Sequence, residues 1–168
     1  SPFLVPRPRS GKTNVVVYLV DALRPDHLSV YGYERETSPF LERLGRQGVV
    51  FRQAYAHSPW TKPSISTLFS SLYPTTHHVG VTSYTDVLPE GVDTLADHLR
   101  RAGYLAACFS ANPLASTLSN LDQGFDFAFL PAAFPIAEEK KKGGKIHSDD
   151  LNRVILRWLE RYAEAPFF

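Results

Sequence analysis

The fold of this chain is decided by residues 14–21, which read NVVVYLVD. Six apolar residues stand between Asn14 and Asp21, far fewer than the roughly 20 that span a bilayer, so we expect no transmembrane segment. Their uninterrupted, β-branched character favours a strand buried on both faces, as in parallel sheets. Asp21 is the first charge after this strand, and we therefore expect it at the carboxyl edge of the sheet.

Segments of strand and helix character alternate along the rest of the chain. The further strand candidates are residues 49–55 and 104–109, and the helix candidates are residues 38–48, 63–72, 94–102 and 146–163. We expect Ser38 and Thr61 to cap the first two helices and a solvated loop at residues 138–145. The alternation predicts an α/β fold with a mostly parallel sheet flanked by helices.

The last of these helices is predicted to be the longest. Ser148 is placed to cap it, and Asp149 and Asp150 suit the positive end of the helix dipole in the first turn. One apolar stripe is expected to be buried, and it consists of Leu151, Val154, Ile155, Trp158, Leu159 and Tyr162.

Composition excludes several classes of protein. Of 168 residues, 43% are apolar and 21% charged, which rules out a disordered or collagen-like chain. The 18 basic and 17 acidic residues give a net charge of +1, so nothing favours a nucleic-acid partner. Cys108 is the single cysteine, which excludes an internal disulfide and a multi-cysteine metal site.

Residues 1–13 are rich in proline and basic side chains, and we interpret them as a linker or arm preceding a domain at 14–168. The Gly11-Lys12-Thr13 sequence does not indicate a phosphate-binding loop, because Pro6 stands where that loop needs its first glycine. The segment also precedes a strand, whereas the loop should follow one.

Two segments could carry chemistry. Asp21 could hold a hard cation at the sheet edge, or serve as a helix cap or as a salt-bridge partner of Arg24. Residues 58–64, SPWTKPS, place the Thr61 hydroxyl before a helix N-terminus, where an anion is favoured. Plain helix capping is the stronger interpretation of that segment on its residues alone.

The histidines add less. His57 lies four residues before Thr61 and is close enough in sequence to reach the same site. His77 and His78 are adjacent and would point to opposite sides of an extended backbone, so joint chelation is not expected. His98 falls on the polar side of a predicted helix, where solvent would surround it.

Three stretches together resemble the N-terminal half of the sulfatase family, within the alkaline phosphatase superfamily. The first is DALRPDHL at 21–28 with YGY at 31–33, and the second is TKPS at 61–64 with SLYP at 71–74 and His77. The third is GFD at 124–126. Their order and spacing extend the resemblance over residues 14–168.

The resemblance implies a metal-dependent hydrolase of sulfate or phosphate esters. Asp21 would be a metal ligand, and Thr61 would be both the nucleophile and a ligand of the cation, which would be Ca²⁺, Mn²⁺ or Zn²⁺. The Thr61 hydroxyl would attack the central atom of a small-molecule, lipid or glycan ester and form a covalent intermediate.

This chain also departs from the family pattern. Formylglycine-dependent sulfatases have cysteine or serine where Thr61 stands and arginine where Ile65 stands. Threonine carries a methyl on its β-carbon, so no formylglycine is expected, and threonine at this position is familiar from phosphoryl-transferring relatives. Phosphoryl chemistry is therefore favoured on mechanism.

Further residues of the family's active-site pattern are replaced in this chain. The second acid of the usual pair is Ala22, and residues 110–113 read SANP where many sulfatases have a lysine and a histidine. Lys62, Asn112 and His57 are the remaining candidates for substrate binding.

The family's second group of metal ligands lies in its C-terminal half. The resemblance therefore implies that a missing C-terminal half completes the sheet and the site, and that this chain alone is inactive and has exposed apolar surface. Many relatives act outside the cytoplasm, so an extracytoplasmic location is in keeping with the resemblance. The alternative is a non-catalytic α/β binding or structural fragment that lacks the other ligands.

Overall fold

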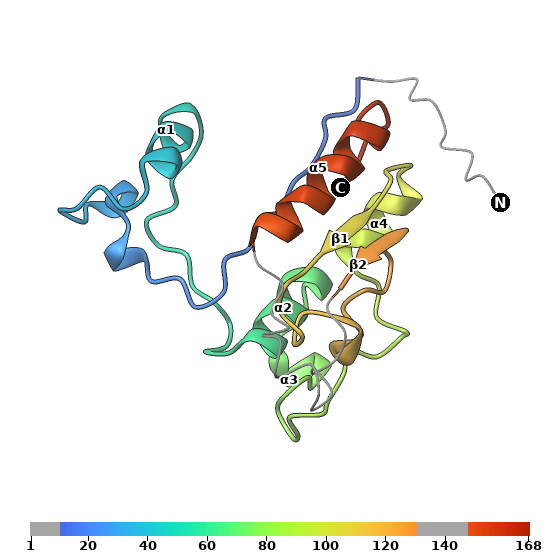
Figure 1. The fold of residues 1–168 in the computed structure, drawn as a ribbon. Helices are drawn as coiled ribbons and strands as arrows, with labels where there is room; N and C mark the ends of the chain where they lie inside the picture. The colour runs from blue at the N-terminus through green and yellow to red at the C-terminus, as the bar shows by residue number, and fades with distance from the viewer. Residues whose placement is uncertain (1–10, 131–147) are drawn as a thin grey trace, which may run out of the picture. The chain divides into compact units, whose positions relative to one another are not determined.

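The computed structural model describes residues 11–130 and 148–168, which form two compact units (Figure 1). The smaller unit is Tyr18–Ala56, with two short 3-10 turns, η1 (Pro25–His27) and η2 (Ser29–Tyr31), and helix α1 (Pro39–Gln47). The larger unit comprises His57–Phe168 and the described residues up to Val17. Its elements are α2 (Thr61–Ser70), α3 (Pro74–His77), α4 (Leu95–Arg101), β1 (Ala107–Phe109), η3 (Thr117–Ser119), β2 (Phe127–Phe129) and α5 (Ser148–Tyr162).

A small parallel sheet lies at the centre of the larger unit. Strands β1 and β2 pair in parallel, with Cys108 opposite Ala128. On the other side of β1, Leu105 forms a parallel bridge with Phe167, and the Leu105 N–H donates to the Pro166 carbonyl at 2.9 Å. Val15 donates in turn to the Phe167 carbonyl at 2.9 Å. The predicted α/β class and the strand within residues 104–109 are confirmed.

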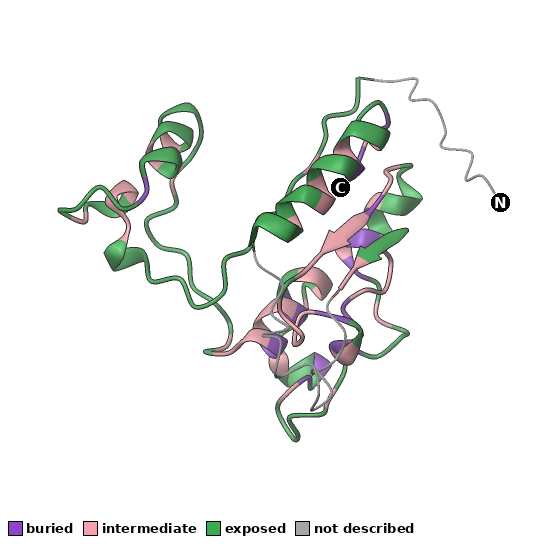
Figure 2. Cartoon of the chain, viewed as in Figure 1, coloured by how far each residue is buried: buried purple, intermediate pink, exposed green. Residues whose placement is uncertain are grey.

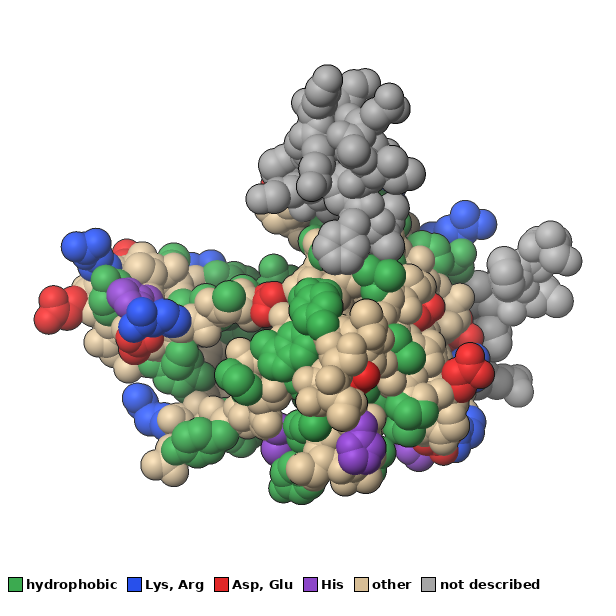
Figure 3. All heavy atoms as spheres, turned by 90° about the horizontal axis from the view of Figure 1, so that it is seen from below, with side chains coloured by type: hydrophobic (Ala, Val, Ile, Leu, Met, Phe, Trp, Pro, Cys, Tyr) green, Lys and Arg blue, Asp and Glu red, His purple; other side chains and the backbone are tan. Residues whose placement is uncertain are grey.

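Two predicted strands are wrong. Residues 14–20 and 49–55 carry no strand assignment, and Tyr18 and Val49 are 79% and 78% exposed. A β-rich run becomes a strand only when a neighbour accepts its backbone hydrogen bonds. In the described chain, only the start of the first run has such a neighbour, through Val15. Hydrophobic side chains accordingly reach the molecular surface (Figure 3).

The helix predictions are confirmed, but two predicted caps are wrong. Helix α1 lies within residues 38–48 and Ser38 occupies its N-cap position, yet the Ser38 hydroxyl makes no capping bond to α1. The hydroxyl instead lies 2.9 Å from the Ser29 hydroxyl and accepts from the Val30 amide at 3.2 Å. Helix α2 begins at Thr61, so Thr61 is the first helical residue and Trp60 occupies the N-cap position. The helix begins two residues before the predicted start at residue 63, so Thr61 lies in the first turn and not at the cap position.

Helices α4 and α5 match the sequence pattern. The Thr94 hydroxyl and the Asp97 carboxylate cap α4 reciprocally, a capping box that satisfies two helix-end amides. In α5, Asp149 and Asp150 lie in the first turn, Trp158 is buried, and the rest of the predicted stripe is half-buried. The predicted loop at 138–145 lies outside the described residues. Among those described, no helix combines the length and the apolar character needed to cross a bilayer.

The core consists of two clusters in the larger unit, where the buried residues concentrate (Figure 2). One cluster is Val79, Leu88 and Leu121, against which Ile65 packs. The other is Ala96, Ala106 and Phe168, and Phe69 and Phe125 pack against it. Cys108, the middle residue of β1, is half-buried, and burial raises the pKa of its thiol to about 11.

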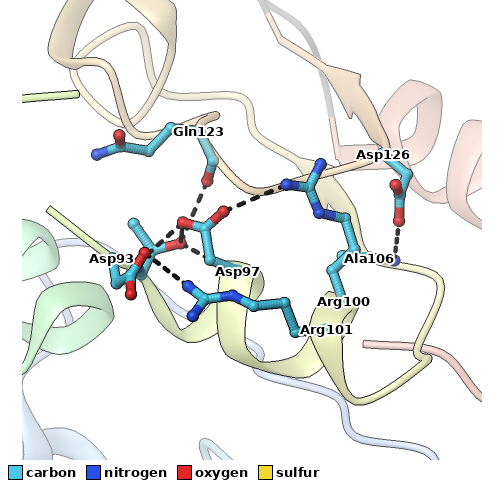
Figure 4. A network of polar contacts seen from close by, with 8 residues as sticks. Asp93, Asp97, Arg100, Arg101, Ala106, Gln123 and Asp126 are labelled. Atoms are coloured by element: carbon cyan, nitrogen blue, oxygen red, sulfur yellow. Dashed lines mark hydrogen bonds and ion pairs between the residues drawn. The ribbon is translucent and has the colours of Figure 1, made fainter. Parts of the chain in front are cut away.

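The Gly124–Asp126 turn ties α4 to the sheet (Figure 4). The φ angle of Gly124 is +85°, and a Cβ there would lie 2.7 Å from both the Thr94 hydroxyl and the Asp97 amide. Asp126 accepts a hydrogen bond from the Ala106 amide at 2.9 Å, alongside β1. Phe125, between them, stacks on Phe168 with ring centroids 5.8 Å apart.

We predict that Gly124→Ala destabilises the protein strongly. The substitution adds backbone strain at a positive φ and forces the turn away from a backbone amide, together costing about 2–4 kcal/mol. Gly103→Ala is the matched control, since Gly103 has a φ of +83° but its added Cβ would meet only the flexible end of Lys12. The control should cost about 1–2 kcal/mol. Equal losses for both variants in denaturant unfolding would contradict the close-approach argument.

Candidate functional site

Thr61 lies at the N-terminus of α2, half-buried, and the residues on either side of it are fixed by the fold. Trp60 has an extended backbone (φ −143°, ψ 164°) and makes no side-chain cap. Pro63 follows within the first turn and is fully buried, which suits its fixed φ and missing N–H. Pro63 offers no N–H of its own, so it is the backbone amides of Thr61 and Lys62, with the helix dipole, that favour an anion close to the Thr61 side chain.

His77 joins α3 to α2 by a buried hydrogen bond. Its Nδ1 accepts from the Val79 amide at 3.0 Å, so the proton of the neutral ring is on Nε2. Nε2 lies 3.0 Å from the Thr67 hydroxyl and donates to it. Burial lowers the pKa of His77, and the carbonyl of Pro63 partly opposes that shift. His77 thus links α3 to the middle of α2 as a neutral side chain. His78, by contrast, is exposed.

Lys62, the residue after Thr61, is only 2% exposed. Its ammonium donates to the Tyr84 carbonyl at 2.9 Å and lies 5.8 Å from the centroid of the Tyr84 ring. Burial lowers the pKa of Lys62, and the nearby Asp86 carboxylate opposes the shift. Substrate binding by Lys62 stays a prediction. In the structure the Lys62 side chain is directed to the backbone at Tyr84.

Asp21 belongs to the smaller unit, in a turn where Ala22 has a φ of +56°. The carboxylate of Asp21 is exposed and accepts a hydrogen bond from the Ala22 amide at 3.0 Å. Arg24, considered above as a salt-bridge partner of Asp21, pairs with Asp26 through Nε at 3.1 Å. That pairing, first through hydrogen bonding, lowers the pKa of Asp26 and raises the pKa of Arg24.

The other two residues predicted to contact substrate, His57 and Asn112, make contacts with residues close to them in the fold. His57 is exposed, and its ring packs edge-on against Tyr73 at 5.1 Å between centroids. The Asn112 side-chain oxygen accepts from the Leu114 amide at 2.9 Å, within a turn that follows β1. His98 is exposed on α4, as its position in the sequence predicted.

The described residues contain no cluster of the side chains that most often bind metals. Across residues 11–130 and 148–168, no group of three or more His, Cys, Asp or Glu side chains gathers closely enough to hold an ion. A divalent cation takes six or more oxygen ligands or a tetrahedral donor set. Asp21 and Thr61 belong to different units, and neither residue by itself supplies such a donor set.

The relationships of the chain to known proteins agree with this fold. The sulfatase family profile matches residues 13–168, and the chain belongs to the sulfatase family. An N-acetylgalactosamine-6-O-sulfatase of Bacteroides thetaiotaomicron is 34% identical over 98 residues, covering 56% of this chain and 19% of that protein. The iduronate 2-sulfatase of Mus musculus is 26% identical over 146 residues, which cover 81% of this chain and 26% of that protein.

A solved structure agrees with these sequence relatives. The 2.40 Å crystal structure of a putative sulfatase from Bacteroides thetaiotaomicron VPI-5482 superposes on this chain with a TM-score of 0.51. It is 27% identical, and the match covers 70% of this chain and 26% of that one. The α/β, alkaline-phosphatase-like fold is therefore confirmed. The chain spans about a fifth of the length of curated relatives such as the N-acetylgalactosamine-6-O-sulfatase.

The sequence interpretation missed the contacts that hold the Thr61 turn. Trp60 stacks on Tyr84, with ring centroids 5.4 Å apart and an interplanar angle of 13°. The sequence did hold a signal that residues 80–86 form an ordered loop. A turn-forming glycine, Gly80, and an acid, Asp86, stand on either side of Tyr84. Ile65, where the family pattern has arginine, packs into the Val79 cluster.

The buried His77 makes stability depend on pH. Its pKa in the fold is lower than the value of about 6.5 in an unfolded chain. As the pH falls below about 6.5, the unfolded state takes up a proton that the fold does not, so stability decreases until the folded pKa is passed. Above pH 7 this effect is absent. Melting temperatures between pH 5 and 7.5 should show this loss.

His77→Gln should flatten that pH dependence and cost about 1–2 kcal/mol at pH 7.5 through the buried hydrogen bond. His98→Gln, on the exposed surface of α4, is the control and should keep the parent profile. A His77→Gln profile as steep as that of the parent would show that other groups cause the pH dependence.

Proposed function

We propose that the full-length protein containing this chain hydrolyses sulfate or phosphate esters, with Thr61 as the nucleophile. The observation that carries the proposal is the position of Thr61. It is the first residue of α2, where helix-end amides favour an anion, in the segment that resembles the family's nucleophile segment. Membership of the sulfatase family supports ester hydrolysis as the reaction.

The proposed chemistry uses the unmodified hydroxyl. The Thr61 hydroxyl gives up its proton to water, and Oγ1 bonds to the sulfur or phosphorus atom as the bond from that atom to the ester oxygen breaks. The departing alkoxide takes up a proton and leaves as the alcohol, and water then hydrolyses the covalent intermediate, which releases sulfate or phosphate and restores the Thr61 hydroxyl. The first-turn amides of α2 would stabilise negative charge on the non-bridging oxygens. Oxidation to formylglycine is not proposed, because the β-carbon of threonine already carries a methyl group.

Two lines of support point to different central atoms. The family and the names of the relatives favour sulfate esters, and several of those names refer to sulfated sugars, so a glycan ester is the proposed substrate class, with lipid esters as an alternative. Thr61 and the core-packed Ile65 favour phosphoryl chemistry on mechanism. The proposed location is extracytoplasmic, by analogy with the family.

The roles of the other residues are proposals as well. We propose Asp21 as one ligand of a divalent cation, with the remaining ligands supplied by parts of the protein beyond the described residues. Asn112 and His57 remain candidates for substrate contact.

A second candidate function is a non-catalytic binding or structural role. The observations that favour it are Ala22 in place of a second acid and the lack of a three-ligand cluster in residues 11–130 and 148–168. Turnover by the full-length protein would exclude it.

We predict that Thr61→Ala in the full-length protein lowers kcat/KM by a factor on the order of 10³ or more, because the covalent step loses its nucleophile. Thr61→Ser should retain measurable turnover, since it keeps the hydroxyl. Initial rates on an aryl sulfate, an aryl phosphodiester and an aryl phosphonate provide the measurement. Thr75→Ala, on the exposed side of α3, is the control. Full activity of Thr61→Ala on all three substrates would reject the nucleophile assignment.

Activity should also depend on a divalent cation. Chelation with EDTA is expected to abolish turnover, and Ca²⁺, Mn²⁺ or Zn²⁺, tested separately, should restore it with different efficiencies. Asp21→Asn should raise the cation concentration needed for half-maximal activity about tenfold or more. Asp26→Asn, whose carboxylate is paired with Arg24, is the control. Unchanged activity in EDTA would remove the metal from the proposal.

A further inference from the structure

A single loop holds both neighbours of Thr61. The Tyr84 loop, which we define as residues 79–86, contacts Trp60 through the Tyr84 ring and Lys62 through the Tyr84 carbonyl. The two rings are nearly parallel, and the ammonium of Lys62 donates at 2.9 Å. Thr61 is thus the middle residue of a three-residue segment whose two ends are anchored to the same loop residue.

The Tyr84 loop is itself ordered by hydrogen bonds. The Asp86 carboxylate accepts from the Thr82 amide at 3.1 Å, the Thr82 hydroxyl at 3.0 Å and the Ser83 amide at 2.8 Å. The Ser83 and Thr85 hydroxyls lie 2.8 Å apart. A loop bonded in this way presents the Tyr84 carbonyl in one direction, which a moving loop would not do.

Close packing anchors the loop at its other end. Gly80 has a φ of +68°, and a Cβ at this position would lie 2.2 Å from the Trp60 ring. Val79, next to it, is fully buried and its amide donates to His77 at 3.0 Å. The loop therefore touches Trp60 from two places and is continuous with the cross-link behind α2.

Lys62 has little freedom to do anything else. Its side chain is nearly fully buried, and a buried ammonium that loses its acceptor bears the cost of desolvation without compensation. Reorienting it toward a substrate would break the bond to Tyr84. The buried ammonium is instead placed to fix the backbone one residue after the nucleophile.

We infer that Lys62 is a positioning residue that, together with Trp60 and the Tyr84 loop, holds the Thr61 hydroxyl in its reactive position. The inference rests on the proposed function, and it extends that function to residues that do not touch the substrate. Misplacing a reacting group by about 1 Å can cost on the order of 100-fold in rate. Loss of the Lys62 anchor should therefore lower kcat, with little effect on substrate binding.

The test is Lys62→Met in the full-length protein, which keeps the alkyl stem and removes the ammonium. We expect kcat on an aryl sulfate or aryl phosphodiester to fall at least tenfold while KM changes by less than about twofold. Hydrogen exchange of the Thr82–Asp86 amides should become faster, since the loop loses an anchor.

Lys12, which is exposed, offers a control for the loss of the same kinds of contact away from Thr61. The Lys12 ammonium also donates to a backbone carbonyl, that of Ala102, and lies 5.5 Å from the centroid of the Tyr104 ring. Lys12→Met removes the same pair of contacts at the end of α4, and it should leave kcat and loop exchange unchanged. Tyr84→Ala gives a second variant should Lys62→Met fail to fold, because the Tyr84 side chain is 58% exposed. It removes the Trp60 stack and should also lower kcat with little change in KM.

Three results would overturn the inference. A rise in KM with unchanged kcat in Lys62→Met would make Lys62 a substrate contact. Unchanged kcat and KM in Lys62→Met, or in Tyr84→Ala where only that variant folds, would remove the positioning role. Equal losses of kcat in Lys62→Met and Lys12→Met would show that the effect comes from a general loss of stability and not from the positioning of Thr61. Failure of the proposed function appears separately, as full activity of Thr61→Ala.

Discussion

The close approach of Gly124 to the start of α4 is the constraint on which the larger unit depends. A side chain at this position would meet the Thr94 hydroxyl and the Asp97 amide at 2.7 Å, so only glycine brings the turn this near. The next residue, Phe125, then enters the core against Phe168, and Asp126 bonds to the backbone beside β1. One turn thus sets the positions of a helix cap, an aromatic core and a sheet edge.

The Thr61 turn is likewise held by few residues. His77 fixes the middle of α2 through Thr67, and the Tyr84 loop holds the residues on each side of Thr61. The His77 and Lys62 contacts are made by buried polar groups, which specify a position more narrowly than apolar packing does, because an unmet hydrogen bond in the interior is costly. The stack of Trp60 on Tyr84 adds aromatic packing to them. Such narrow placement is what the proposed role of Thr61 as nucleophile would require.

Much of this organisation could be predicted from the sequence, and the failures have physical reasons. The helices were predictable because glycines, prolines and apolar spacing act locally, as α1, α4 and α5 show. The strand at 104–109 was predictable, whereas the apolar run at 14–20 was not, because strand formation depends on a partner that no local pattern encodes. Lys62 was a candidate for substrate binding whose direction the sequence left open, because spacing cannot show where a long side chain ends. Its contact with Tyr84 joins residues 22 positions apart and leaves no periodic trace.

The sheet also has a consequence for how the chain is made. The Phe167 amide bonds to the Asn14 side chain across 153 positions, and Val15 donates back to Phe167. Contacts of such long sequence separation form late in folding. During synthesis from the N-terminus, Asn14 and Val15 must therefore wait for Phe167 before these two bonds can form. The rest of the apolar run, residues 16–20, gains no strand partner in the described part of the chain and stays exposed, so it remains open to association with other chains after folding as well.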